Sequence, residues 1–137
     1  MKQRRYMPSV ADLIDRLSID LLKQVFLSDK KEIYIEEMGE ILDDLDLLLG
    51  NKEVKLTGNL IRAILLVGQL NTHIWYNESA VRKGNKQDLE KLRLTHSING
   101  LRSLAKNRIL AELGEIEGVD FKVDCLAADY KEWDIEI

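Results

Sequence analysis

The amino-acid sequence predicts a mainly α-helical protein: an antiparallel four-helix bundle with a short C-terminal β-hairpin or strand-like tail. Three observations support this fold class. Apolar residues recur at helical spacing over four long stretches, and short polar turns separate these stretches. Long helices joined by short connections pack as antiparallel neighbours. In the last part of the chain the apolar residues alternate with polar ones, as they do in strands.

The first helix is expected to begin at Ser9. Ser9 and Asp12 give the S-x-x-D sequence of a capping box, directly after Pro8. The apolar residues that follow at helical spacing are Val10, Leu13, Ile14, Leu17, Leu21 and Val25. This spacing predicts one buried face, which the helix needs in order to pack against a neighbour.

The second helix is expected to begin near Asp29 and to stop at Gly50 and Asn51, which supply a C-terminal signal. Its apolar residues at helical spacing are Tyr34, Met38, Ile41, Leu42, Leu45 and Leu48. Residues 32–46 hold seven acidic residues and no basic one. We therefore expect this helix to present an acidic face to solvent.

The third helix is expected from about Thr57 to Arg82, and the fourth from about Gln87 to Leu113, with Gly114 beyond its end. The polar "KGN" between them is short. A short turn makes these two helices antiparallel neighbours.

The tail differs from the helices in pattern and in charge. "GVDFKVDCL" and "EWDIEI" alternate apolar and polar residues, and residues 112–137 hold nine acidic residues against two lysines. We expect residues 1–114 to form the helical bundle. Residues 115–137 are then an acidic, strand-like tail that packs on the bundle or on a second subunit.

Composition excludes several classes of protein. The 137 residues, 45% of them hydrophobic, suit one domain with its own core, and no apolar run reaches the length of about 18 residues that a membrane helix needs. The one cysteine, Cys125, forms no internal disulfide, so a reducing cytoplasm is the expected compartment. One Cys and two His make a metal site unexpected. With a pI of 5.3 we expect no nucleic-acid partner, and no motif calls for a cofactor.

Polar residues continue an apolar stripe on the third helix. Leu60, Ile64 and Val67 lie on one stripe at about 100° per residue. Continuing that stripe gives four polar or aromatic residues within about 60° of arc: Asn71, Trp75, Glu78 and Arg82. These residues therefore take positions where core residues are expected.

The fourth helix repeats this arrangement. Leu89 and Leu92 begin an apolar stripe that Leu110 and Leu113 resume, and His96, Asn99, Arg102 and Lys106 stand between them. A short turn brings the two polar sets face to face. Burying a charged side chain without a partner lowers the stability of the fold by several kcal/mol. The charged side chains of these two sets must therefore form pairs or stay in contact with water.

Two interpretations of the polar sets stay open. In the first, Glu78 pairs with Arg102 or Arg82, Trp75 fills space, and the network only fixes helix register. In the second, one glutamate cannot neutralise Arg82, Arg102 and Lys106, so the excess positive charge binds an anion. Trp75 would then stack on the ligand, while the amides and His96 would supply hydrogen bonds.

The same residues carry a family resemblance. The spacing N-x3-W-x2-E-x3-R in helix three, followed by N-x2-R-x3-K in helix four, resembles an uncharacterised family of small bacterial and phage proteins. That family is a domain of unknown function, and its bacterial members are often encoded near sugar-transfer genes. "LIDRLSI" in the first helix is also similar, so the resemblance spans about residues 10–110. Ser79 departs from the acidic residue of the family pattern. The resemblance implies that the polar set is a site and brings no known activity.

These patterns favour binding without chemical transformation. We expect a cytoplasmic protein, in the host cytoplasm if phage-encoded, that binds or sequesters a small anionic ligand such as a nucleotide or sugar phosphate. The alternative is a phage-type interaction or inhibitor module, which acts on a protein partner through the acidic second helix and the acidic tail, with the polar cluster purely structural. Helices this amphipathic also favour a homo-oligomer.

Overall fold

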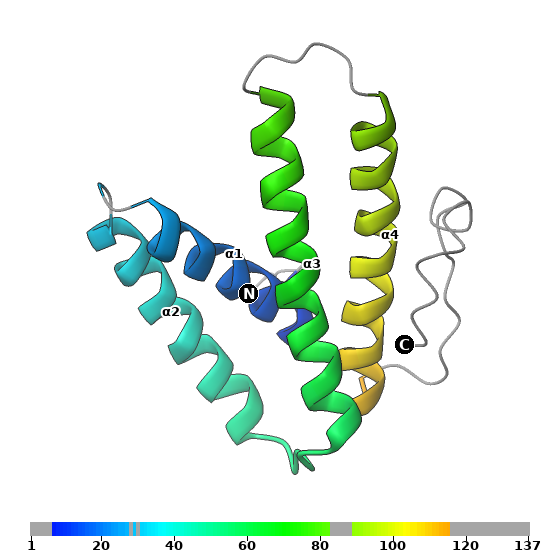
Figure 1. Ribbon diagram of the computed structural model, residues 1–137. Helices are drawn as coiled ribbons and strands as arrows, with labels where there is room; N and C mark the ends of the chain where they lie inside the picture. Colours follow the sequence, from blue (N-terminus) through cyan, green and yellow to red (C-terminus); the bar gives the residue numbers. More distant parts are fainter. Residues whose placement is uncertain (1–6, 28, 30, 83–88, 116–137) are drawn as a thin grey trace. The chain divides into compact units, whose positions relative to one another are not determined.

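The computed structural model describes residues 7–27, 29, 31–82 and 89–115; within its helices, the side chains of residues 79–82 and 89–92 are not described. The elements in these ranges are helices: α1 (Val10–Phe26), α2 (Lys31–Gly50), α3 (Gly58–Arg82) and α4 (Leu89–Glu112) (Figure 1). The mainly α class is therefore confirmed. The chain divides into two compact units, Met1–Lys55 with α1 and α2, and Leu56–Ile137 with α3 and α4.

The start of α1 is the predicted one. Ser9 is the N-cap, and its hydroxyl accepts from the backbone N–H of Asp12 at 3.1 Å. The Asp12 carboxylate in turn accepts from the backbone N–H of Ser9 at 3.0 Å. This reciprocal pair satisfies two backbone donors that the first turn of a helix otherwise leaves open, which fixes where α1 begins.

In the first unit α1 and α2 run antiparallel. Arg16 Nε lies 4.0 Å from Glu37 Oε1, and Lys23 Nζ lies 5.3 Å from the centre of the Tyr34 ring. Later residues of α1 thus meet earlier residues of α2. The buried apolar residues of this unit are Val10, Ala11, Leu13 and Leu22 on α1, and Met38, Ile41 and Leu45 on α2.

The carboxyl group of Asp20 is an exception within this apolar set. Asp20 is only 2% exposed, and among the described residues its Oδ2 atom has no hydrogen-bond partner. Burial raises the pKa of Asp20 above its ordinary value of 3.8, and the charge of Glu37 on α2 adds to the rise. Lys23 and Arg16 act in the opposite direction on this pKa, with smaller effects. Burial of the Asp20 carboxylate therefore lowers the stability of the folded first unit when this group is ionised.

In the second unit α3 and α4 also run antiparallel. The Thr57 hydroxyl, just before α3, donates to Glu112 Oε2 at the end of α4 at 3.1 Å. Further along, Arg102 donates to Asn71 at 2.9 Å. The core between the helices is formed by Leu60, Ala63, Val67, Leu70 and Ile74 from α3, and by Ile98, Leu101, Ala105 and Ile109 from α4. Figure 1 shows the two helices side by side.

A glycine ends α4 in the manner that the sequence predicts. Gly114 has φ 73°, a left-handed conformation that glycine adopts without a Cβ clash. The backbone N–H of Gly114 donates to the carbonyl of Ala111 at 3.0 Å, and that of Glu115 donates to the carbonyl of Leu110 at 2.9 Å. These two bonds are a Schellman motif, which satisfies carbonyls that the last turn leaves open.

The predicted C-terminal hairpin or strand-like tail, residues 115–137, falls almost wholly outside the described residues, which end at 115. The domain division at residue 114 therefore stays a prediction. None of the described helices has the length and the apolar character that crossing a bilayer requires.

Candidate functional site

The structure brings together one residue from each predicted polar set. Arg102 Nη1 of α4 donates to Asn71 Oδ1 of α3 at 2.9 Å, in a partly buried position. Asn71 is only 3% exposed and lies between the buried apolar residues Val67 and Ile74, while Arg102 is half-buried. The acceptor is a neutral amide oxygen. The contact therefore fixes the guanidinium in place without cancelling its charge.

On α3, the rest of the predicted set lies further out. Trp75, one turn beyond Asn71, is half-buried, and Glu78 is exposed. Arg82 ends α3, and its side chain lies outside the described part of the structure. The side chains of α3 that are described here thus leave the core gradually as the helix approaches its C-terminal end.

On α4, the predicted set splits. Asn99 and Lys106 are half-buried, one turn to either side of Arg102, whereas His96 is exposed. The buried stripe of this helix runs through Ile98, Leu101, Ala105 and Ile109 and is joined by Ser97. This differs from the expected stripe through Leu89, Leu92, Leu110 and Leu113: the last two of these are half-buried, and the side chains of the first two are not described. The polar set of α4 therefore borders the core and does not interrupt it.

Helix geometry places five of these residues along one side of the α3/α4 pair. Asn71 lies about 40° to one side of Val67, and Trp75 lies about 40° further round. On α4, rotation from the core stripe in the same direction reaches Arg102, Lys106 and Asn99. When two antiparallel helices face each other, residues that are rotated from the two core stripes in the same direction lie on the same side of the pair. The hydrogen bond between Asn71 and Arg102 shows this. We name this side the Asn71 flank.

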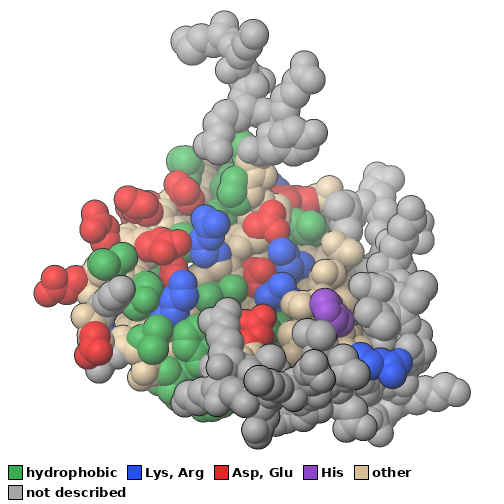
Figure 2. Space-filling view, turned by 90° about the horizontal axis from the view of Figure 1, so that it is seen from above, with side chains coloured by type: hydrophobic (Ala, Val, Ile, Leu, Met, Phe, Trp, Pro, Cys, Tyr) green, Lys and Arg blue, Asp and Glu red, His purple; other side chains and the backbone are tan. Residues whose placement is uncertain are grey.

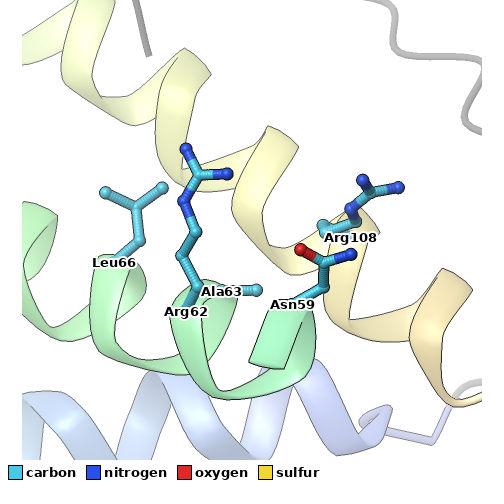
Figure 3. Close-up of a pocket in the computed structure, with 5 residues that line it drawn as sticks. All are labelled: Asn59, Arg62, Ala63, Leu66 and Arg108. Atoms are coloured by element: carbon cyan, nitrogen blue, oxygen red, sulfur yellow. The ribbon is translucent and has the colours of Figure 1, made fainter. Parts of the chain in front are cut away.

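The opposite flank carries a hollow that the sequence did not reveal. It is lined by Asn59, Arg62, Ala63, Leu66 and Arg108 and is open to solvent, and the space of about 200 Å³ among these residues includes open solvent. Figure 3 shows Arg62 beside Leu66, Asn59 near Arg108, and Ala63 between them. Two arginines, one from each helix, thus line the hollow together with the apolar residues Ala63 and Leu66. His73 is half-buried on α3.

A pattern in the sequence could have indicated part of this second set. Asn59 and Arg62 are three residues apart in the first turns of α3, so they share a face. Arg108 is 46 residues from Arg62 and joins that face only through the pairing of α3 with α4. The hollow can therefore be found only when the register between α3 and α4 is known.

Chemical groups for catalysis or metal binding do not gather in the described ranges: no three His, Cys, Asp or Glu side chains come close enough there to hold a metal ion. Comparison of the chain with protein-family models, curated proteins and solved structures finds no match.

Proposed function

We propose that the Asn71 flank of α3 and α4 binds a small anionic ligand, such as a nucleotide or a sugar phosphate, without transforming it. The observation that carries the proposal is the hydrogen bond from Arg102 to Asn71. Asn71 orients the guanidinium through one donor at 2.9 Å, and an arginine has five. The remaining donors suit a phosphate, which arginine binds in a bidentate, charge-assisted way.

Neighbouring residues supply the other contacts that such a ligand needs. Lys106 is one turn from Arg102 on the same flank and adds positive charge. Trp75 is half-buried on the facing helix and offers an aromatic surface for stacking, while the Asn99 amide offers a donor and an acceptor. Glu78 and His96 belong to the outer part of the proposed site, since both are exposed, and the predicted role of Arg82 stays a prediction because its side chain lies outside the described part of the structure.

The decisive test is thermal unfolding against a panel of nucleotides, cyclic nucleotides, sugar nucleotides and phosphate. A ligand at about 100 times its dissociation constant should stabilise the wild-type protein by roughly 2.7 kcal/mol, a visible rise in Tm. Arg102→Ala should abolish that rise. Arg93→Ala, which removes an exposed arginine from the same helix, should keep it.

A second variant guards against simple misfolding. Asn71→Asp places a carboxylate where the neutral amide now accepts from Arg102. The ion pair should preserve the fold while it cancels the charge that the ligand needs. Loss of the ligand-induced Tm rise in a protein of unchanged helicity would support the proposal. An undiminished rise in Asn71→Asp and Arg102→Ala would refute it.

One observation favours a second candidate function, a protein-interaction module that works through α2. Acidic residues and large apolar residues are exposed together along this helix, among them Glu40, Asp43, Leu42 and Leu47, the last 67% exposed. Figure 2 shows red acidic side chains interspersed with green hydrophobic ones over the α1/α2 pair. Exposed apolar groups with charged neighbours are typical of a surface that binds another protein.

The second candidate function predicts that substitutions on α2, and not substitutions on α4, abolish binding of a protein partner. In affinity capture from a host lysate, Leu47→Lys should release any specific partner, because it places a charge in the apolar contact. Arg102→Ala should keep that partner. The reverse pattern, with capture lost in Arg102→Ala and kept in Leu47→Lys, would exclude α2 as the working surface. The acidic tail, predicted to share this role, lies outside the described residues.

We further propose that the two helix pairs join in one antiparallel four-helix bundle. We also propose that the protein is a homo-oligomer, that it is cytoplasmic, and that it belongs to the uncharacterised family of bacterial and phage proteins. Sedimentation of the wild-type protein would decide the oligomeric state.

A further inference from the structure

We propose that two copies of this chain associate through the side of α3 that faces away from α4. This inference rests on the proposed homo-oligomeric state and names its contact surface. The surface is formed by Ile61, Leu65, Gly68, Thr72 and Tyr76. At about 100° per residue these five lie within about 80° of arc, roughly 160° round the helix from the residues that form the core with α4. We name them the Leu65 stripe.

The large side chains of the Leu65 stripe are exposed. Ile61 is 44% exposed, Leu65 62% and Tyr76 54%. Single exposed apolar residues are common on proteins, but apolar residues that follow one another along one side of a helix typically mark a contact surface. Removing such a surface from water favours association.

The two smaller residues of the Leu65 stripe are also compatible with a contact. The Thr72 hydroxyl donates to the carbonyl oxygen of Gly68, one turn earlier, at 2.9 Å. This bond lies within the helix, so a second chain can cover Thr72 without leaving the hydroxyl donor unmet. Gly68 has no side chain, and a small residue at a contact lets two helices approach closely.

The Leu65 stripe lies in a part of α3 that has no charged residue. Residues 63–77 contain no Asp, Glu, Lys or Arg, over a length of about 22 Å. The charged residues next to this segment, Arg62 and Glu78, lie about 40° and 80° beyond the edges of the stripe. A helix with one buried face usually carries charged residues on the opposite face. The side of α3 that faces away from α4 therefore lacks the usual character of a solvent face.

This charge pattern favours a second copy as the partner. The chain has a net charge of −4, so two copies repel each other wherever their charged surfaces meet. In a two-fold symmetric contact the same surface meets itself. The apolar residues of α2 are unsuited to that, because exposed acids such as Glu40 and Asp43 would face like charges. The Leu65 stripe meets its own copy without any charge.

The test measures the mass of the full chain by sedimentation equilibrium over a range of concentrations. The wild type should show a monomer–dimer equilibrium. Leu65→Lys should raise the dissociation constant of the dimer roughly a hundredfold, because it places two positive charges in an uncharged contact. Ile61→Lys should weaken the dimer in the same direction. Leu47→Lys is the matched control, since Leu47 is 67% exposed on α2, and should keep the wild-type constant.

The outcomes separate this inference from the proposals on which it rests. A wild type that stays monomeric would refute both the homo-oligomer and this contact. A wild-type dimer that Leu65→Lys and Ile61→Lys leave unchanged would refute the contact alone. Arg102→Ala, which tests ligand binding at the Asn71 flank, should not change the dimer.

Thermal unfolding of dilute protein tests whether the Leu65 stripe packs inside the chain. At concentrations at which the wild type is monomeric, Leu65→Lys should unfold at the wild-type Tm and keep the wild-type helical content by circular dichroism. A clearly lower Tm would refute the contact between copies, because it would show that Leu65 is covered by another part of the same chain.

Discussion

Replacing Ile98 with alanine is expected to lower the free energy of unfolding by about 3 kcal/mol, within the range of about 2–5 kcal/mol for such a truncation in a core. Ile98 is 0% exposed and lies on the buried stripe of α4. Truncation removes three carbon atoms from this position. Because the neighbours relax only partly, a cavity adds to the lost burial.

Urea denaturation, followed by circular dichroism at the helix band, measures this loss. Leu65→Ala is the matched control on α3, since Leu65 is 62% exposed and its truncation should cost less than about 1 kcal/mol. Equal losses for the two variants would contradict the assignment of the core between α3 and α4.

Replacing Asp20 with asparagine is expected to stabilise the protein at pH 7 by about 1 kcal/mol. Burial, and then Glu37, raise the pKa of Asp20 in the folded protein. A raised pKa means that the folded state binds this proton more tightly than the unfolded state does. The contribution of Asp20 to stability therefore falls as the pH rises from 3.8 through the raised pKa.

The pH dependence separates this effect from a change in packing. The advantage of Asp20→Asn over the wild type should be full above the raised pKa of Asp20 and should shrink as the pH falls towards 3.8, where the wild-type carboxyl is protonated when folded. Unfolding by urea at several pH values gives the two curves. Asp43→Asn, an exposed change on α2, is the control. A difference that does not vary with pH would contradict the burial of a charged Asp20.

Helix ends were the most predictable part of the fold. The predicted cap at Ser9 is the observed N-cap, and Gly50 and Gly114 lie at and beyond the ends of α2 and α4 as expected. These signals are local: a hydroxyl or a missing Cβ acts on backbone groups a few residues away. The predicted third helix, from about Thr57 to Arg82, also matches α3 closely.

The buried face of α4 was harder to predict, because its leucines are spread around the helix. The large residues Leu104 and Leu110 are only half-buried, while the small residues Ser97 and Ala105 are buried. Small side chains let neighbouring helices approach closely, and an apolar pattern weighted by size misses them. For the same reason His96 was expected on the inner face and is exposed.

The candidate site was predictable where polar residues of α3 and α4 lie at the same level along the paired helices. Extending the α3 stripe gave Asn71, and the α4 pattern gave Arg102, which the structure joins by a hydrogen bond. The hollow with Arg62 and Arg108 stayed hidden, since neither arginine belongs to a polar interruption of an apolar stripe. Finding it requires knowing which residues of the two helices stand opposite each other.

The ending of α4 has a practical consequence for genetics. Its two hydrogen bonds use the backbone N–H groups of Gly114 and Glu115 and no later residue. A stop codon placed directly after codon 115 would therefore leave every bond of this ending intact. If deletion of the acidic segment that follows changes the behaviour of the protein, loss of these two hydrogen bonds at the end of α4 is not the cause, because neither uses a residue of that segment.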